Sequence, residues 1–94
     1  MSFDQKDPPL GGIELVGVRL KQARMANNLA LQDISDRTRI SQRFLTAIEN
    51  DDFSALPGRV YIFGFTKAFA RAVGLDEEGL LTALREKMQS AGAD

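Results

Sequence analysis

Apolar residues recur along this chain at the three- and four-residue spacing that is typical of amphipathic α-helices. The first such run ends at the pair Asn27-Asn28, and its apolar members are Leu15, Val18, Leu20 and Ala23. Asn tolerates the left-handed backbone in which many helices end, so the sequence predicts a first helix that stops at this pair. No segment alternates apolar and polar residues with a period of two. We therefore expect an all-α fold with about five short helices.

A second short helix is predicted from Leu31 to a point near Thr38. Its inner face carries Ile34 and the small residue Ser35, which suits a close crossing with the next helix. Ile40 follows at once and bridges a tight connection. Two short helices joined by such a turn form a helix-turn-helix unit.

The third helix begins after Ser41, whose hydroxyl is expected to accept an unpaired amide hydrogen of the first turn. This helix ends near Asn50, and its inward residues are Leu45 and Ile48. Residues 51–58 contain acidic residues, Pro and Gly, which predict a loop or a single turn.

The last two helices are separated by Gly74, which suits the left-handed position after a helix. The fourth covers residues 60–73, and Asp76 is expected to cap the fifth. Glu77 and Glu78 lie near the positive end of that last helix, where acidic side chains are stabilising. The apolar stripe of the fifth helix consists of Leu80, Leu81, Leu84 and Met88.

These elements predict one domain at residues 13–91. Residues 1–12 hold two prolines and two glycines without a period and are interpreted as a flexible N-terminal arm. Residues 92–94 are interpreted as the start of a linker or tail. There is no apolar run long enough to cross a bilayer and no charged-then-apolar leader, so the chain itself is expected to be soluble and cytoplasmic.

Composition removes several kinds of chemistry. The 94 residues include no Cys and no His, so disulfides, thiolate zinc sites and the commonest general base are excluded. No arrangement of nucleophile, base and orienting group is visible, and the acidic pairs at 51–52 and 76–78 suit loop and helix-start roles. We expect no enzyme activity, no metal, no cofactor and no small-molecule substrate.

Charge is unevenly distributed. The formal net charge is -1, which argues against a generic nucleic-acid binder. Residues 14–75 hold nine basic and six acidic residues, whereas residues 76–94 hold two basic and five acidic ones. The body is thus mildly basic, which suits an ordinary mixed surface and also an acidic partner.

The segment from Leu31 to Glu49 resembles the XRE/Cro-like helix-turn-helix family. That resemblance implies DNA recognition through the exposed start of the third helix, where Gln can pair with adenine and Arg with guanine. The candidate base contacts are Ser41, Gln42 and Arg43, and the candidate phosphate contacts are Arg37, Arg39 and Lys21.

Two departures from that family's pattern weaken the DNA interpretation. Leu31 stands where many DNA-binding members have Gln, and Gln32 is displaced by one position. Arg39 stands at the turn position that is often Gly, so it must adopt a positive φ or reshape the turn. For residues 41–43 a scaffold role is therefore favoured.

The fourth helix is unusually apolar. A surface helix needs an apolar stripe somewhat over about 100° wide, and residues 60–73 carry one roughly twice as wide. Tyr61 and Phe65 form one ridge at its edge, beside Lys67 and Arg71. Either these aromatics fill the core or some of them remain exposed as a partner site, and both interpretations stay open.

The run DFSALPGRVY at residues 52–61, followed by GF at 64–65, FAR at 69–71 and GLD at 74–76, resembles the cytoplasmic domain of the RodZ family. The resemblance covers roughly residues 14–85. It implies a domain at the cytoplasmic face of the bacterial inner membrane that binds the actin-like filament protein MreB in cell-shape maintenance. Membrane attachment is then expected through segments not in this chain.

The resemblance also implies site residues. The family's aromatic contacts fall on Tyr61 and Phe65, and a basic residue at the turn falls on Arg39. Relatives often have Tyr at position 65. Phe65 lacks that hydroxyl, so the hydrogen bond that it would make to the partner is in doubt here, though the packing is not. Phe69 is expected to support the two aromatics, with Arg43 and Lys67 adding charge at the rim. The alternative function is a sequence-specific DNA-binding regulator, and weak DNA binding is compatible with either.

Overall fold

The computed structural model describes residues 15–92, and this range confirms the expected all-α class. Its helices are α1 (Leu15–Ala26), α2 (Leu31–Thr38), α3 (Gln42–Glu49), α4 (Arg59–Ala72) and α5 (Glu77–Gly92), with a single 3₁₀ turn, η2 (Phe53–Ala55), before α4. The predicted arm, residues 1–12, lies outside the described residues, and α5 extends to Gly92, one residue past the predicted end of the domain.

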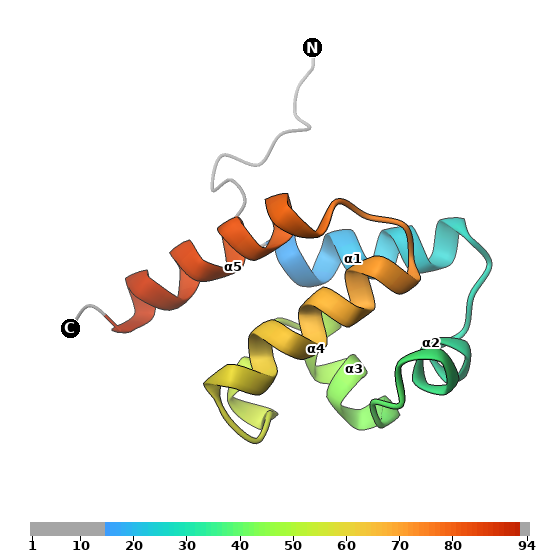
Figure 1. The fold of residues 1–94 in the computed structure, drawn as a ribbon, viewed down its shortest axis with the longest axis horizontal. Coiled ribbons are helices and arrows are strands. Elements are labelled where there is room, and N and C mark those ends of the chain that lie inside the picture. Colours follow the sequence, from blue (N-terminus) through green and yellow to red (C-terminus); the bar gives the residue numbers. More distant parts are fainter. Residues whose placement is uncertain (1–14, 93–94) are drawn as a thin grey trace, which may run out of the picture.

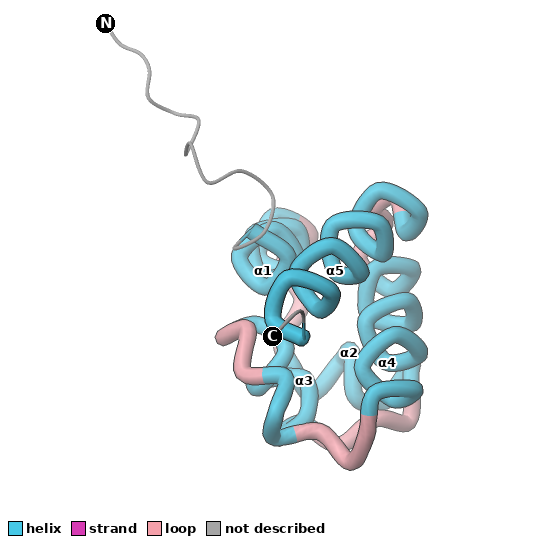
Figure 2. Tube along the Cα trace, turned by 90° about the vertical axis from the view of Figure 1, so that its left-hand side faces the viewer, coloured by secondary structure: helices cyan, strands magenta, loops and turns pink. Residues whose placement is uncertain are grey.

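The helices form a small bundle with the helix-turn-helix unit at one end. α2 packs against α3, and both contact α4, while α1 packs against α3. α5 contacts α4 and α1 (Figure 1). Figure 2 shows α5 lying across α1 and α4, with α2 and α3 at the opposite end of the bundle. This arrangement leaves one side of α3 and one side of α4 facing solvent next to each other.

Each helix contributes at least one fully buried apolar side chain to a single core. These side chains are Val16, Leu20, Ile34, Leu45, Ile48, Phe69, Leu80 and Leu84. The inward positions predicted for α3 and for Leu80 and Leu84 are therefore confirmed. Val18, a member of the apolar run that predicted α1, is exposed. The buried stripe of α1 is Val16 and Leu20, four residues apart, and Val18 lies on the other side of the helix.

The helix ends follow the predicted backbone conformations. Asn28 and Gly74 have positive φ, as predicted after α1 and α4, and Arg39 adopts the positive φ that was one of its two expected alternatives. The Asp76 carboxylate accepts the amide hydrogens of Glu78 and Gly79, each at 3.3 Å, so the predicted cap of α5 is confirmed.

Ser41 departs from its predicted role. It occupies the N-cap position of α3 in an extended conformation, but its hydroxyl makes no capping hydrogen bond. The first amides of α3 instead bond to the Ser41 carbonyl, from Phe44 at 3.0 Å and Leu45 at 3.3 Å. The serine hydroxyl therefore remains available at the surface.

A buried ion pair fixes α1 to α3. Arg24 Nε donates to Glu49 Oε2 at 2.6 Å, and Arg24 Nη2 donates to Glu49 Oε1 at 3.2 Å. Arg24 Nη1 also donates to the Leu29 carbonyl at 2.9 Å. The hydrogen bond with Glu49 raises the pKa of Arg24 above its ordinary value, and burial opposes that rise. Both side chains are largely enclosed, so the pair is shielded from salt and water.

Candidate partner interface on α3 and α4

The turn between α2 and α3 is locked by short contacts. Ser35 Oγ donates to the Ile40 carbonyl at 2.6 Å, and the Ile40 side chain is buried. Arg39 stands in the left-handed region, with φ of 64°, and its side chain is exposed. The turn thus holds a guanidinium at the surface at the position where the sequence departs from the glycine pattern.

The exposed start of α3 is already engaged within the chain. Gln42 Nε2 donates to Gln32 Oε1 at 2.6 Å, and Gln32 Nε2 donates to Asp36 at 2.9 Å. The Arg43 guanidinium lies over the Phe44 ring, 4.9 Å from its centroid. A cation over an aromatic face is attracted by the ring quadrupole. Gln42 and Arg43, the two side chains best suited to base recognition, therefore already have partners within the chain.

Three aromatic rings connect α3 to α4. The centroids of Phe44 and Phe65 are 5.8 Å apart, and those of Phe65 and Tyr61 are 5.5 Å apart, both in tilted arrangements. These spacings are in the range that aromatic pairs prefer. We call Phe44, Phe65 and Tyr61 the aromatic row. Phe44 and Phe65 are half-buried, whereas Tyr61 is 47% exposed.

Phe44 and Val60 are not among the site residues predicted from the sequence. Phe44 lies four residues before Ile48, a spacing that could have placed it on the border of the buried face of α3. Val60, at the start of α4, is 74% exposed. The apolar spacing along α4 does not show whether Val60 is buried or exposed, because its exposure depends on where α4 begins relative to η2.

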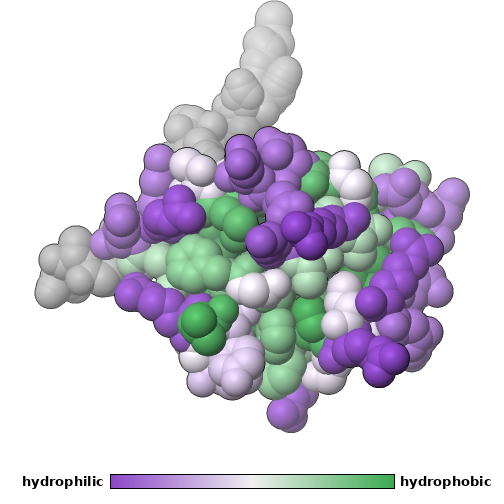
Figure 3. All heavy atoms as spheres, in the orientation of Figure 1, coloured by the Kyte–Doolittle hydropathy of each residue, from purple (hydrophilic) through white to green (hydrophobic). Residues whose placement is uncertain are grey.

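α4 has a buried face and an exposed face, so part of it fills the core, and a partner site on the exposed face stays a prediction. Ile62, Thr66, Phe69, Ala70 and Val73 are buried, while the opposite face carries the exposed Val60, Tyr61, Gly64, Lys67 and Arg71. Figure 3 shows the resulting apolar band over α4, bordered by hydrophilic residues.

Phe69, expected as a support for the two aromatics, has no exposed surface, so it cannot be a direct partner contact. It can act on the interface only through the packing beneath it. Thr66 is a polar residue on the buried face of α4. Its side chain is fully buried, and its hydroxyl has no hydrogen-bond partner among the described residues.

Exposed basic side chains occur on α3 and α4, which carry the aromatic row, and on the neighbouring α2 and its turn. Arg37, Arg39, Arg43, Lys67 and Arg71 are all exposed. Arg37 and Arg71 line a hollow of about 390 Å³ between α2 and α4, together with Thr38, Ala68 and Ala72. Arg71 Nε donates to Glu77 Oε2 at 2.6 Å within the chain. The face can therefore receive acidic groups beside an apolar strip.

Other kinds of site are not assembled in the part of the chain that the structure describes. Across residues 15–92, no three acidic side chains are grouped so that they could hold a metal ion. None of the helices in that range combines the length and the hydropathy that a bilayer span requires.

The chain is similar to a known domain family and to proteins of known sequence. A family described as a helix-turn-helix domain matches residues 19–80. The uncharacterized membrane protein YmfM of Bacillus subtilis is 40% identical over 52 residues, which cover 55% of this chain and 18% of that protein. The cytoskeleton protein RodZ of Streptococcus pneumoniae is 38% identical over 68 residues, which cover 72% of this chain and 25% of that protein. The chain thus spans a quarter or less of the length of these relatives.

A solved structure is also similar. It is that of YmfM from Staphylococcus aureus, a membrane protein regarded as a candidate for DNA binding. The two structures superpose with a TM-score of 0.72 and 32% sequence identity, over 77% of this chain and 88% of that one. The likeness covers nearly all of the described helices.

Proposed function

We propose, from the premise that this chain belongs to the helix-turn-helix domain family of RodZ-like proteins, that it is a protein-interaction module for an MreB-like actin filament. In this proposal the aromatic row is the docking surface, and the domain acts by binding rather than by catalysis. The RodZ of Streptococcus pneumoniae is named a cytoskeleton protein, which supports a cytoskeletal partner here.

The observation that carries the proposal is the exposure of Tyr61 at the end of the aromatic row. Aromatic anchors surrounded by smaller contacts dominate the binding energy of many protein interfaces. Tyr61 offers a ring that Phe65 and Phe44 hold in place, so little side-chain freedom is lost on binding. Its neighbour Val60 extends the apolar area.

Charge supports an acidic partner surface. The basic side chains around the row are exposed, and those of Arg39, Arg43 and Lys67 form no ion pair with another part of the described chain. Such rim charges increase the association rate and fix the orientation of a complex more than they add affinity. We expect binding to weaken moderately as ionic strength increases.

The test is co-sedimentation of the chain with MreB filaments over a range of filament concentrations. Tyr61→Ala removes the exposed anchor and should weaken binding by about 30-fold, which corresponds to about 2 kcal/mol. Met25→Ala is the matched control, because Met25 is an exposed apolar residue on α1 and should leave binding unchanged. The proposal fails if folded Tyr61→Ala, verified by circular dichroism, pellets with the same affinity as the unmodified chain.

A second candidate is DNA binding, which the likeness to the Staphylococcus aureus structure favours. Arg43 and Gln42 would have to leave their present partners to reach base edges, while Arg37 and Arg39 are exposed and could contact phosphates. Binding of this kind falls steeply with salt because counterions are released from the duplex. Absence of any gel retardation on mixed-sequence duplexes at low salt would exclude it.

We also propose that the domain works at the cytoplasmic face of a bacterial inner membrane. Both YmfM relatives are named membrane proteins. Attachment would come from segments not in this chain. Fractionation of cells that express the complete coding sequence tests this, since the domain should then sediment with membranes.

A further inference from the structure

The hollow of about 390 Å³ between α2 and α4 contains two guanidinium groups, and none of the described residues that line it is acidic. One guanidinium comes from the last turn of α2 and the other from the last turn of α4, and these two helices are in contact. We call this site the arginine hollow. Its lining residues are Arg37, Thr38, Ala68, Arg71 and Ala72.

Both arginines keep hydrogen-bond donors for a further acceptor. Arg37 Nη1 donates weakly to the Ala72 carbonyl, at 3.5 Å. Arg71 Nε donates to Glu77 Oε2 at 2.6 Å, and the Arg71 side chain is still 64% exposed in that ion pair. A guanidinium has five N–H donors and no acceptor. Because one carboxylate faces two guanidiniums, the hollow keeps a net positive charge.

The arginine hollow continues the aromatic row along α4. Tyr61, Phe65, Ala68 and Ala72 are separated by four, three and four residues, which places them on one face of the helix. From Phe65 to Ala72 this face extends over about 10 Å, at 1.5 Å per residue. A partner segment that covers the Phe65 ring can therefore reach both arginines with a side chain about two helical turns further along.

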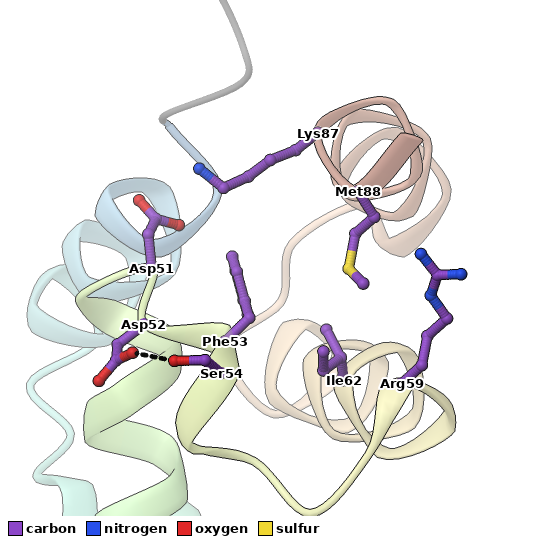
Figure 4. A pocket seen from close by; sticks show the side chains of 8 residues that line it. All are labelled: Asp51, Asp52, Phe53, Ser54, Arg59, Ile62, Lys87 and Met88. Atoms are coloured by element: carbon purple, nitrogen blue, oxygen red, sulfur yellow. Dashed lines mark hydrogen bonds between the residues drawn. The ribbon is translucent and has the colours of Figure 1, made fainter. Parts of the chain in front are cut away.

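Two other hollows differ in charge or in position. A groove of about 440 Å³ between η2, α4 and α5 has two carboxylates and two cations in its lining, those of Asp51, Asp52, Arg59 and Lys87. Figure 4 shows both carboxylates on one side of Ile62 and Met88, and the Arg59 cation on the other. A smaller hollow of about 220 Å³ contains Arg59 and Arg85, but it lies on the α5 side of α4. Of the three, the arginine hollow combines excess positive charge with a place beside the aromatic row.

We propose that the arginine hollow binds an acidic side chain of the filament partner, an Asp or Glu carboxylate about 10 Å from the group that covers Phe65. This inference rests on the proposed function, because it assigns one subsite of the same docking surface. A guanidinium presents parallel N–H groups that match the two oxygens of a carboxylate. The methyl groups of Ala68 and Ala72 suit the methylene stem of such a side chain. A DNA phosphate offers oxygens without that stem, so the acidic side chain is favoured.

Co-sedimentation with MreB filaments tests the subsite through two charge-matched double variants. Arg37→Gln with Arg71→Gln should weaken binding at least about tenfold, because a carboxylate of the partner loses its hydrogen-bonded cations. Arg59→Gln with Arg85→Gln removes two cations from the hollow on the α5 side and should stay within about twofold of the unmodified chain, since distant exposed charges are screened. Circular dichroism verifies that both variants are folded.

Equal binding by the two double variants would overturn the subsite. If Tyr61→Ala still weakened binding in that case, the proposed function would stand without it. If the unmodified chain did not pellet at all, the proposed function and the subsite would fail together. Loss of duplex retardation by Arg37→Gln with Arg71→Gln, with filament binding unchanged, would assign the hollow to a phosphate and overturn the proposal.

Glu77→Gln separates partner binding from support of the fold. It removes the carboxylate that engages Arg71 within the chain, so filament binding should become about threefold tighter, because more of the domain is then ready to bind. If Arg71 acted only by holding the start of α5, Glu77→Gln would weaken binding as Arg71→Gln does. That result would overturn the proposal.

Discussion

Gly17 is the point of closest approach between α1 and α3, and replacing it with Ala tests how tightly these helices are packed. A Cβ at this position would lie 2.4 Å from the carbonyl oxygens of both Ile48 and Glu49. Both contacts are with backbone, so no flexible side chain can move aside. α1 would have to shift away from α3 by about 1 Å to restore ordinary contact, which loses up to about half of the dispersion energy of the contacts it opens.

The expected cost follows from opposing terms. Overpacking of a close-packed site costs about 1–3 kcal/mol, and the shift also strains the Gly17–Asp51 hydrogen bond. Replacing Gly by Ala in a helix returns at most about 1 kcal/mol of backbone entropy. We therefore expect Gly17→Ala to lower the free energy of unfolding by about 2 kcal/mol. With a urea m-value of about 1 kcal/mol/M for a small domain, the unfolding midpoint falls by about 2 M.

Gly64→Ala is the matched control. Gly64 is also helical, in α4, and a Cβ there would meet nothing within 4 Å. This variant should raise the unfolding free energy by up to about 1 kcal/mol, because only the backbone entropy changes. Urea unfolding followed by circular dichroism measures both. If Gly17→Ala were as stable as the unmodified chain, or both variants were stabilised equally, the close approach of α1 to α3 would be wrong.

Other contacts of the described chain lead to four further predictions. Glu49→Gln should lower the free energy of unfolding by about 3–5 kcal/mol, since it leaves the enclosed Arg24 charge without its partner. Adding Arg24→Met removes that charge and should restore part of the lost stability, which a double-mutant cycle by urea unfolding measures. The pKa of Arg24 is raised in the folded chain, so the stability gained from its charge is present below the ordinary arginine pKa and is lost only above it. The free energy of unfolding that Arg24 contributes should therefore be the same at pH 7 and at pH 10, measured by urea unfolding. Thr66→Val should raise the melting temperature, with a gain of about 1 kcal/mol, because it removes a buried hydroxyl without a partner. Phe44→Ala should weaken filament co-sedimentation at least as much as Arg43→Ala, since it removes support for Phe65. If the folded Phe44→Ala variant bound as tightly as the unmodified chain, α3 would not be part of the interface.

The helices and their ends could be predicted from sequence because each depends on local chemistry. The positive φ at Asn28 and Gly74 and the carboxylate cap at Asp76 follow from residue types at single positions. The inward residues Leu45 and Ile48 follow from spacing within one helix. None of these features requires knowledge of which helices are neighbours.

Other features depend on tertiary neighbours and were beyond the reach of the pattern. The ion pair of Arg24 with Glu49 joins residues 25 positions apart, and the approach of Gly17 to α3 depends on the crossing of two helices. Thr66 is polar but faces the core, because α4 is packed by α5 on one side and by α2 and α3 on another, which buries more than one stripe.

The aromatic row changes what the helix-turn-helix unit presents. In a DNA-reading unit the start of the second helix must project clear of its neighbours to enter the major groove. Here Arg43 lies over Phe44, and Phe44 is packed on Phe65 of α4, so the start of α3 and the exposed side of α4 form one continuous surface. If the filament and the nucleic acid bind as proposed, they therefore compete for this surface, because a ligand that covers Phe44 also covers Arg43.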